Sequence, residues 1–472
     1  MTSLSETSML AGSSGVTSGY TIDQSIRFDQ NANASMSRTP SSASSRTTWT
    51  FSWWWKRGNL TNSSDGTNQR QPIFGTTAFS ILSNHNSTTI DGINVVYTGS
   101  ANDIQTSEQY RDVSAWYHFV FVLDTTNDIS SERVRLYKNG ERVTSFASIT
   151  YPSKDTTYTV NNTQAHYIGL RNSGENLDGY LAEMHFLDGY AYDASYFGEF
   201  NSNNIWIPKE YEGSYGTNGF HIDGRDSGDL GDDESGNGND YTTSGMAAHD
   251  QVLDSPTNNF CVMSSIDFTY NAIRNGNLET IGGNNNKGGR GTMGFSSGKF
   301  YWEMLATTVS DGYPGSGVVY DSYASSMPTA YAGGGTNYGS GASHNQANWY
   351  KQSTSGTAYG STASSGDILQ YAVDRDNNKI YWGVNGTYRN SGDPAGGTGA
   401  VASSLTHRGD WMPFVSHGSN AGTSAGTFNF GQDGTFAGAK TAQGNSDGNG
   451  VGNFYYSPPS GFLALCSKNL GS

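Results

Sequence analysis

The chain has 472 residues, more than one hydrophobic core usually serves, and this length favours two or three domains. Only 14% of the residues are charged, while 13% are aromatic and 61 are glycine, a composition typical of strands and loops rather than of a disordered chain. The net charge of −16 comes without a local basic stripe, so nucleic acid and anionic membranes are excluded as expected partners.

Residues 1–20 are small and polar, and we expect them to form a flexible or docking arm. They have neither the basic region nor the apolar core of a signal peptide. No apolar run of the sequence approaches the length of a transmembrane helix. We therefore expect a chain that is made in a cytoplasm and is not inserted into a membrane.

Residues 21–209 consist of short alternating segments separated by turn residues, a pattern that predicts an antiparallel β-sandwich. The pair Asn139-Gly140 tolerates the positive φ of a tight hairpin turn. The segments that carry the pattern are TWTFSWWWK, GINVVYTG, AWYHFVFVLD, RVRLYKNGERVTSF, AHYIGL and GYLAEMHFLDG.

The segment TWTFSWWWK contains four tryptophans, and each could belong to the hydrophobic core or form a platform for a ligand. At the two-residue period of a strand, Trp49, Phe51, Trp53 and Trp55 share one face, which we expect to fill the space between two sheets. Trp54 shares the opposite face with threonine, serine and lysine. Two interpretations of Trp54 stay open, a structural position under a covering loop and a platform for a sugar ring.

Residues 210–260 read as an acidic connector rich in glycine and asparagine. Closely spaced carboxylates and amides on a flexible loop are what a hard cation such as calcium prefers. The EF-hand spacing is absent, so a solvated loop without an ion is the alternative, and no cofactor is expected to be required. The candidate calcium ligands are Asp229, Asp232, Asp233, Asn237, Asn239 and Asp240.

Residues 261–472 are expected to form a second β-sandwich, so the predicted fold class is all-β with two sandwiches. The stretch 331–350 is rich in small polar residues and has aromatic ends, a composition that suits sugar binding or packing between subunits. The candidate ligand-binding residues are Trp54, Tyr338, His344, Asn345, Trp349 and Tyr350.

No catalytic residues are expected. The sequence contains no closely spaced carboxylate series of the kind that sandwich glucanases use, no P-loop and no nucleophile elbow. Glu183 and His185 share a strand face and could do acid-base work, but a structural role is favoured, as it is for Glu303. The nine histidines are too scattered along the sequence to indicate a metal site.

The segments of the first sandwich, in this order, resemble the concanavalin A-like (LamG-like) jelly roll. The phrases SRTPSSA, KRGNL, WIPKEYEGSYGTNGF and SPTNNFC resemble the version found in structural proteins of tailed bacteriophages. In the second half, SSGKFYWEM, GDILQYAVDRDNNKIYWGVNG, WMPFVSHG, TFNFGQDGTF and PPSGFLALC resemble the SPRY (B30.2-like) sandwich.

The resemblance implies a non-enzymatic virion protein, most plausibly part of a tail fibre or appendage that binds a host-surface glycan. It also implies other virion proteins as partners and a homo-oligomer, with a trimer as one candidate assembly. Two alternatives stay open. One is a purely structural head decoration, head fibre or tail adaptor, and the other is a polysaccharide depolymerase whose carboxylate pair the sequence does not reveal.

Overall fold

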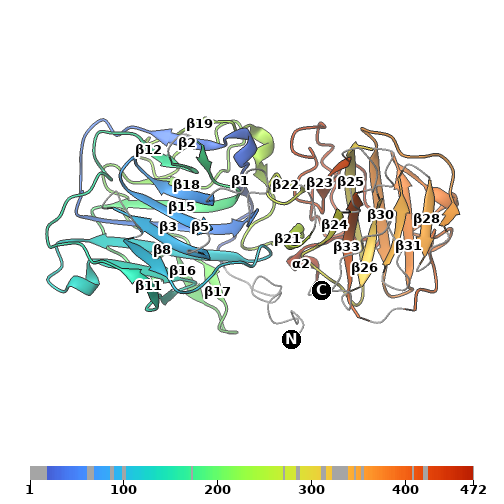
Figure 1. The fold of residues 1–472 in the computed structure, drawn as a ribbon, viewed down its shortest axis with the longest axis horizontal. Coiled ribbons are helices and arrows are strands. Elements are labelled where there is room, and N and C mark those ends of the chain that lie inside the picture. The colour runs from blue at the N-terminus through green and yellow to red at the C-terminus, as the bar shows by residue number, and fades with distance from the viewer. Residues whose placement is uncertain are drawn as a thin grey trace. The chain divides into compact units, whose positions relative to one another are not determined.

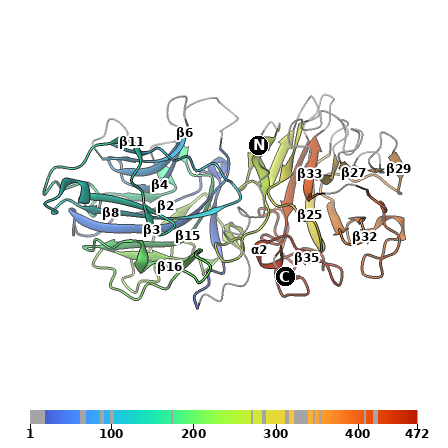
Figure 2. The same cartoon turned by 90° about the horizontal axis from the view of Figure 1, so that it is seen from below.

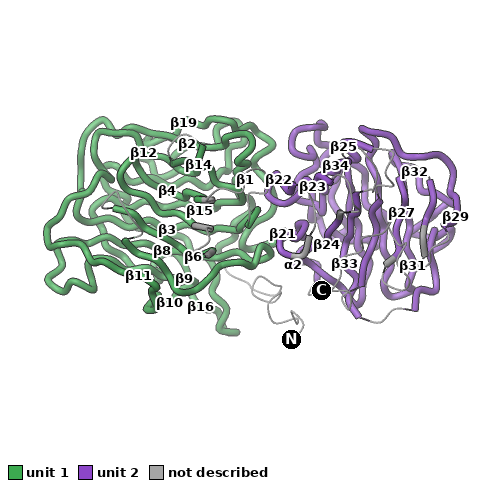
Figure 3. Tube along the Cα trace, viewed as in Figure 1, with its two compact units in different colours: residues 1–259 green, residues 260–472 purple. Residues whose placement is uncertain are grey.

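The computed structural model describes residues 19–60, 69–85, 90–97, 103–171, 174–268, 272–282, 287–309, 315–320, 339–344, 347–351, 356–406, 409–417 and 424–470. The chain divides into two compact units, residues 1–259 and 260–472 (Figure 3). Each unit is built of antiparallel sheets with short helical turns, which confirms the predicted all-β class with two sandwiches (Figure 1).

One large sheet of the first unit runs in the order β10-β9-β8-β3-β15-β1-β20, with β18 also paired to β15. The hairpin between β9 and β10 turns at Asn139-Gly140, both with positive φ as predicted. The strands are β1 (Ser25–Phe28), β3 (Thr48–Arg57), β8 (Trp116–Asp124), β9 (Val134–Lys138), β10 (Glu141–Arg142), β15 (Gly179–Asp188), β18 (Phe220–Ile222) and β20 (Gln251–Val252).

The opposite sheet of the first unit has the order β11-β7-β6-β5-β4-β12-β2-β19. Its strands are β2 (Ser35–Arg38), β4 (Gln69–Gly75), β5 (Ser80–His85), β6 (Ile90–Val96), β7 (Ile104–Thr106), β11 (Phe146–Ile149), β12 (His166–Ile168) and β19 (Thr242–Ser244). Two small ribbons are added by β13 (Leu170–Arg171) with β14 (Glu175–Asn176), and by β16 (Gly198–Phe200) with β17 (Trp206–Pro208).

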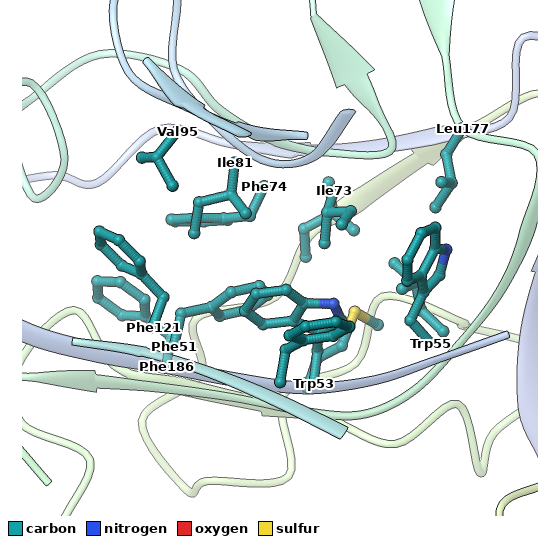
Figure 4. Close-up of a cluster of buried hydrophobic side chains, with 14 of the residues drawn as sticks. Phe51, Trp53, Trp55, Ile73, Phe74, Ile81, Val95, Phe121, Leu177 and Phe186 are labelled. Carbon is teal, nitrogen blue, oxygen red and sulfur yellow. The ribbon is translucent and has the colours of Figure 1, made fainter. Parts of the chain in front are cut away.

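The core of the first unit lies between these two sheets. Trp49, Phe51, Trp53 and Trp55 are fully buried there, and aromatic and aliphatic side chains of the opposite sheet face them (Figure 4). Phe51 stacks on Phe74 with ring centroids 4.6 Å apart. The prediction that one face of this strand fills the sandwich is therefore confirmed, because alternate residues of a strand point to the same side.

The outer face of the β3 sheet is also buried, as the interpretation of Trp54 as a structural residue under a covering loop requires. Thr50, Ser52 and Lys56 are inaccessible, and the ammonium of Lys56 lies 2.6 Å from a carboxylate oxygen of Asp254. The covering residues include Tyr190 and Tyr192, which bond to Thr50, and Asp254, which pairs with Lys56.

Residues 210–259 belong to the first unit and are not a separate connector, a departure from the expected boundaries. Strands β18, β19 and β20 from this segment pair with β15, β2 and β1. The acidic, glycine-rich composition hid these short strands, because only three or fewer residues of each contribute to the pattern.

The second unit contains a sheet in the order β21-β24-β33-β26-β27-β28-β29. It is shown from two directions in Figures 1 and 2. The strands are β21 (Met263–Phe268), β24 (Lys287–Gly291), β26 (Gly315–Tyr320), β27 (Gly339–Ser343), β28 (Asn348–Lys351), β29 (Gly356–Ala358) and β33 (Trp411–His417).

The facing sheet of the second unit has the order β22-β23-β34-β25-β30-β31-β32, and β35 adds a parallel pair to β25. Between the two sheets lies a core that includes Trp302, Trp349, Trp382 and Trp411. The strands are β22 (Ala272–Arg274), β23 (Glu279–Gly282), β25 (Lys299–Thr308), β30 (Ile368–Asp374), β31 (Lys379–Val384), β32 (Thr387–Tyr388), β34 (Ser424–Asn429) and β35 (Leu463–Ala464).

Helical structure is confined to single turns in the described residues. Across the parts of the chain that the structure describes, no helix has the length and apolar character needed to cross a membrane. The helical turns are η2 (Gln30–Ala32), η3 (Ser130–Glu132), η4 (Ala194–Tyr196), η5 (Ala248–Asp250), η7 (Arg389–Ser391) and α2 (Ser467–Leu470).

Candidate functional site

Three of the predicted ligand-binding residues lie in the interior. Trp54 is 5% exposed and stacks on His118, with ring centroids 4.7 Å apart. In the second unit, the indole N–H of Trp349 donates to Ser340 Oγ at 2.8 Å, and His344 Nε2 lies 2.8 Å from Ser316 Oγ. Their rings pack against protein, so the structure supports the structural interpretation for all three.

The structure does not describe the side chains of the remaining predicted ligand-binding residues. Tyr338 and Asn345 lie outside the described residues, and Tyr350 is described only by the backbone of β28. The hypothesis of a binding loop over 331–350 therefore stays a prediction.

The predicted calcium ligands are occupied largely by hydrogen bonds within their own loop. The Asp233 carboxylate accepts from the backbone N–H groups of His221, Ser235 and Asn239 at 2.8 to 2.9 Å. The other candidates serve similar turns, since Asp229 accepts from Gly231 N, Asp240 accepts from Asp233 N, and the Asn237 and Asn239 amides donate to Gly219 O.

Among the predicted calcium ligands, only the more exposed carboxylates could still bind the ion. The pKa of Asp232 is raised by partial burial and by the like charges of Asp240 and Asp229, which indicates that these three groups lie near one another. Mutual repulsion of carboxylates is common on acidic loops without an ion, so calcium stays a prediction.

A buried polar network lies instead on the outer face of β15, centred on Glu183. A β-bulge interrupts the pairing of β15 with β3 between Ala182 and His185, and Glu183 takes a positive φ of 47°. A bulge re-aims side chains, and here it places Glu183 beside His185 on the outer face. A non-glycine residue in this conformation is strained, so the surrounding contacts must hold it.

Strand β18 completes the network, because its His221 lies directly opposite His185 across the β15–β18 pairing. The two imidazole rings stack with centroids 4.2 Å apart. Oxygen Oε2 of Glu183 accepts hydrogen bonds from Tyr20 Oη at 2.8 Å, His221 Nε2 at 3.1 Å and His185 Nε2 at 3.2 Å. His185 Nδ1 accepts from the hydroxyl of Tyr215 at 2.9 Å.

The charges in this network follow from its contacts. Burial opposes the charge of Glu183, but hydrogen bonds from His185 and His221 outweigh it and lower the pKa of the carboxyl. Burial also opposes the charge of His221, yet its bond to Glu183 leaves the pKa of that imidazole raised. The pKa of His185 falls to about 4 through burial and the neighbouring His221. The network is thus one ion pair with a neutral histidine.

Glu183, His185 and His221 also offer the donor set of a transition-metal site, with one oxygen and two ring nitrogens within 4.8 Å of one another. A metal ion binds an imidazole nitrogen along the lone pair, which lies in the plane of the ring. The two planes are only 12° from parallel in a stacked pair, so one ion cannot lie near both at bonding distance. The arrangement suits shared protons better than a metal ion.

The chain above this network forms what we call the aromatic lobe, residues 190–211. Its underside packs on the sheet, with Ala194, Phe197 and Tyr211 against Val120, Val122 and Leu187. Phe197 and Tyr211 also contact the ring of His185, with centroids 5.4 and 5.9 Å away. The buried network therefore supports the lobe directly.

Two aromatic pairs reach the surface of the aromatic lobe. Tyr192 and Tyr196 stack face to face, with centroids 4.0 Å apart, and Tyr196 is 43% exposed. Phe200 is 45% exposed and meets Trp206 edge-on at 5.0 Å. Five large hydrophobic side chains are exposed among the described residues, and two of them belong to this lobe.

Both pairs are held by polar anchors below them. Thr50 Oγ1 accepts from the backbone N–H of Tyr192 at 3.0 Å and donates to Tyr190 O at 2.8 Å. The indole N–H of Trp206 donates to His118 Nδ1 at 3.0 Å. Burial lowers the pKa of His118 to about 3, so it stays neutral and keeps Nδ1 as an acceptor. The lobe is therefore preorganised.

Sequence reasoning placed Glu183 and His185 on one strand face, but it missed the contribution of His221 and the whole aromatic lobe. The separation of 36 positions between His185 and His221 gave no hint that β18 would pair with β15. The run GYAYDASYFGEF, residues 189–200, did carry a signal for the lobe, since tyrosines and phenylalanines recur beyond the end of a strand.

Comparison with known proteins locates a family resemblance in the first unit. Residues 29–193 match the model of the concanavalin A-like lectin/glucanases superfamily. No curated protein sequence matches the chain.

Solved structures similar to the chain include the SPRY domain of human HERC1, 16% identical over 32% of this chain and 87% of that domain, with a TM-score of 0.26. A candidate carbohydrate-binding protein of Bacteroides ovatus is 15% identical over 48% of this chain and 58% of its own, with a TM-score of 0.34. A heptameric SAP-like pentraxin of Limulus polyphemus is 16% identical over 36% of this chain and 78% of its own, with a TM-score of 0.26.

Proposed function

We propose that the protein is a non-enzymatic, carbohydrate-binding component of a tailed-phage particle that contributes to attachment to the host surface. The observation that carries this proposal is the match of residues 29–193 to a superfamily of lectins and glucanases. The assignment to a phage particle rests on the sequence phrases that resemble phage structural proteins, and it goes no further than that resemblance.

Binding is favoured over hydrolysis by the state of the central carboxylate. A glycoside hydrolase needs one carboxyl group as an acid and a second as a base or nucleophile, both facing the sugar. Glu183 is buried, charged and bonded to Tyr20, His185 and His221, so it is committed to holding the fold together.

Attachment by such a protein would depend on repetition. One shallow sugar site binds weakly, but copies arranged around a symmetric homo-oligomer raise the effective concentration and give firm retention. The proposal includes a homo-oligomer, with a trimer as one candidate assembly, that other virion proteins hold in place on the particle.

The test is saturable binding of purified, fluorescently labelled full-length protein to intact cells of candidate hosts, with purified host-surface polysaccharide as competitor. We expect saturation and displacement by the polysaccharide. Absence of binding by the correctly assembled oligomer would contradict the proposal and favour a purely structural virion role. Release of new reducing ends would instead favour a depolymerase.

A further inference from the structure

The surface of the aromatic lobe combines flat apolar rings with hydrogen-bonding side chains. Tyr196 and Phe200 are the most exposed aromatic residues described in the first unit, and both belong to this segment. A pyranose ring presents an apolar C–H face that packs on an aromatic ring, while its hydroxyls need polar partners at the edge. The lobe offers both on one short stretch of chain.

The rings are fixed in place before any ligand arrives. The turn η4 is capped by Asp193, whose side chain accepts from Ser195 N at 3.0 Å, and the Phe197 N–H bonds to Ala194 O at 3.0 Å. Strands β16 and β17 pair through three residue positions, which places Phe200 opposite Trp206. A site that is already ordered loses little conformational entropy on binding, which matters for a shallow contact.

The chain of the aromatic lobe and the residue after it are acidic. Their carboxylates are exposed, Lys209 is the one basic residue in the stretch 190–212, and Arg135 of β9 donates to Ala191 O at 3.1 Å. Carboxylates accept hydrogen bonds from sugar hydroxyls but repel uronate, sialate and phosphate groups. The acidic side chains are Asp193, Glu199, Glu210 and Glu212.

We propose that the aromatic lobe is a binding site for neutral hexopyranose units of a surface glycan, with Tyr196 and Phe200 as stacking platforms. This inference rests on the proposed function, and it names the surface and the class of sugar. A small patch of a few rings matches one or two sugar units better than a protein, whose interface would require a much larger area.

The experiment uses the full-length protein and immobilised oligosaccharides of matched length, one set neutral and one set containing uronic acids, with binding measured by biolayer interferometry. We expect neutral glycans to bind and Tyr196→Ala and Phe200→Ala each to weaken that binding about tenfold, which corresponds to about 1.4 kcal/mol. Tyr196→Phe keeps the ring and should bind like the unaltered protein.

The matched control is Tyr151→Ala, which removes a 36% exposed aromatic side chain of the same unit outside the lobe. It should leave binding unchanged, and thermal melting of each variant checks that the fold is intact. Binding that survives both alanine substitutions would overturn the assignment of the lobe, while the proposed function would stand. A preference for acidic glycans would overturn the neutral class. Failure of the unaltered protein to bind any glycan would overturn the proposed function itself.

Discussion

Glu183 shows how a single residue organises the outer face of a sheet. Its positive φ at a bulge turns the carboxylate toward two histidines, and its three accepted hydrogen bonds repay the strain. Because Tyr20 is the last residue of the predicted arm, the same carboxylate also fixes the start of the described chain to β15. Glu183, which the sequence offered as a catalytic candidate, therefore stabilises the fold by joining three segments of the chain.

Replacement Glu183→Gln is expected to lower the free energy of unfolding by about 2 to 3 kcal/mol. The amide keeps the shape of the side chain, but it removes the negative charge that pairs with His221. Its NH2 group is a hydrogen-bond donor, and it would face neighbours that themselves donate. Urea denaturation measures the change. The control Glu199→Gln alters an exposed carboxylate and should shift stability by less than about 0.5 kcal/mol. Equal stability of both variants would show that the network contributes little.

At the level of elements, the β16–β17 ribbon depends on a glycine beneath a tryptophan. A Cβ added at Gly198 would lie 2.3 Å from the ring of Trp206, although the backbone there suits an ordinary residue. The ring is also fixed by the hydrogen bond from its indole N–H to His118, so it has little freedom to move aside. Space, and not backbone conformation, therefore explains this glycine.

We expect Gly198→Ala to displace Trp206 and to destabilise the first unit by about 1 to 3 kcal/mol. The measurement is thermal unfolding together with tryptophan fluorescence, which should report a more exposed indole. Gly448→Ala is the matched control, because a Cβ there meets no atom within 4 Å. An unchanged melting temperature and spectrum for Gly198→Ala would contradict the packing described for the lobe.

The acidic loop supports a prediction about calcium. The contacts of Asp233 and Asn239 already close the loop through protein donors, so folding does not require an ion. Addition of a calcium chelator is expected to leave the melting temperature unchanged. A fall in the melting temperature that added calcium reverses would instead establish a calcium site at the more exposed carboxylates.

At the scale of the whole molecule, buried neutral histidines predict how stability depends on pH. Burial lowers the pKa of His118, His344 and His417 to about 3, and that of His166 to about 4. The unfolded chain binds these protons near pH 6.5, so below that pH the unfolded state is favoured. The contribution of these neutral histidines to the free energy of unfolding is complete above pH 6.5 and is lost as the pH falls toward 3 to 4.

Each such histidine is expected to cost about 1.4 kcal/mol of stability per unit of pH within this window. The urea midpoint of each unfolding transition, measured between pH 7 and pH 4, should therefore fall steeply as the solution becomes acidic. A midpoint that stays constant, or one that rises, over this range would contradict the buried neutral state of these imidazoles.

Much of the architecture was predictable from local patterns. Alternation in TWTFSWWWK placed the core face of β3, and Asn139-Gly140 placed a hairpin turn. These features depend on neighbours in sequence, for which strand period and turn chemistry suffice. The all-β class followed from the same signals.

The candidate site was not predictable in this way. The contact between His185 and His221 requires a strand pairing across 36 residues. The sequence left open whether Trp54 is covered, because the residues that pack with it include Ile22 and Val252, which are distant in the chain. The segment 210–260 was misread because its acidic composition is typical of loops, while its short strands are stabilised by partners in existing sheets. Long-range packing overrode local composition in each case.

We propose that the protein binds a host-surface polysaccharide without cutting it. The most direct test incubates the full-length protein with purified polysaccharide and follows both by size-exclusion chromatography with light scattering. We expect the protein to elute with the polysaccharide and the polymer recovered after deproteination to keep its original length. Protein that elutes separately, or a polymer that becomes shorter, would contradict it.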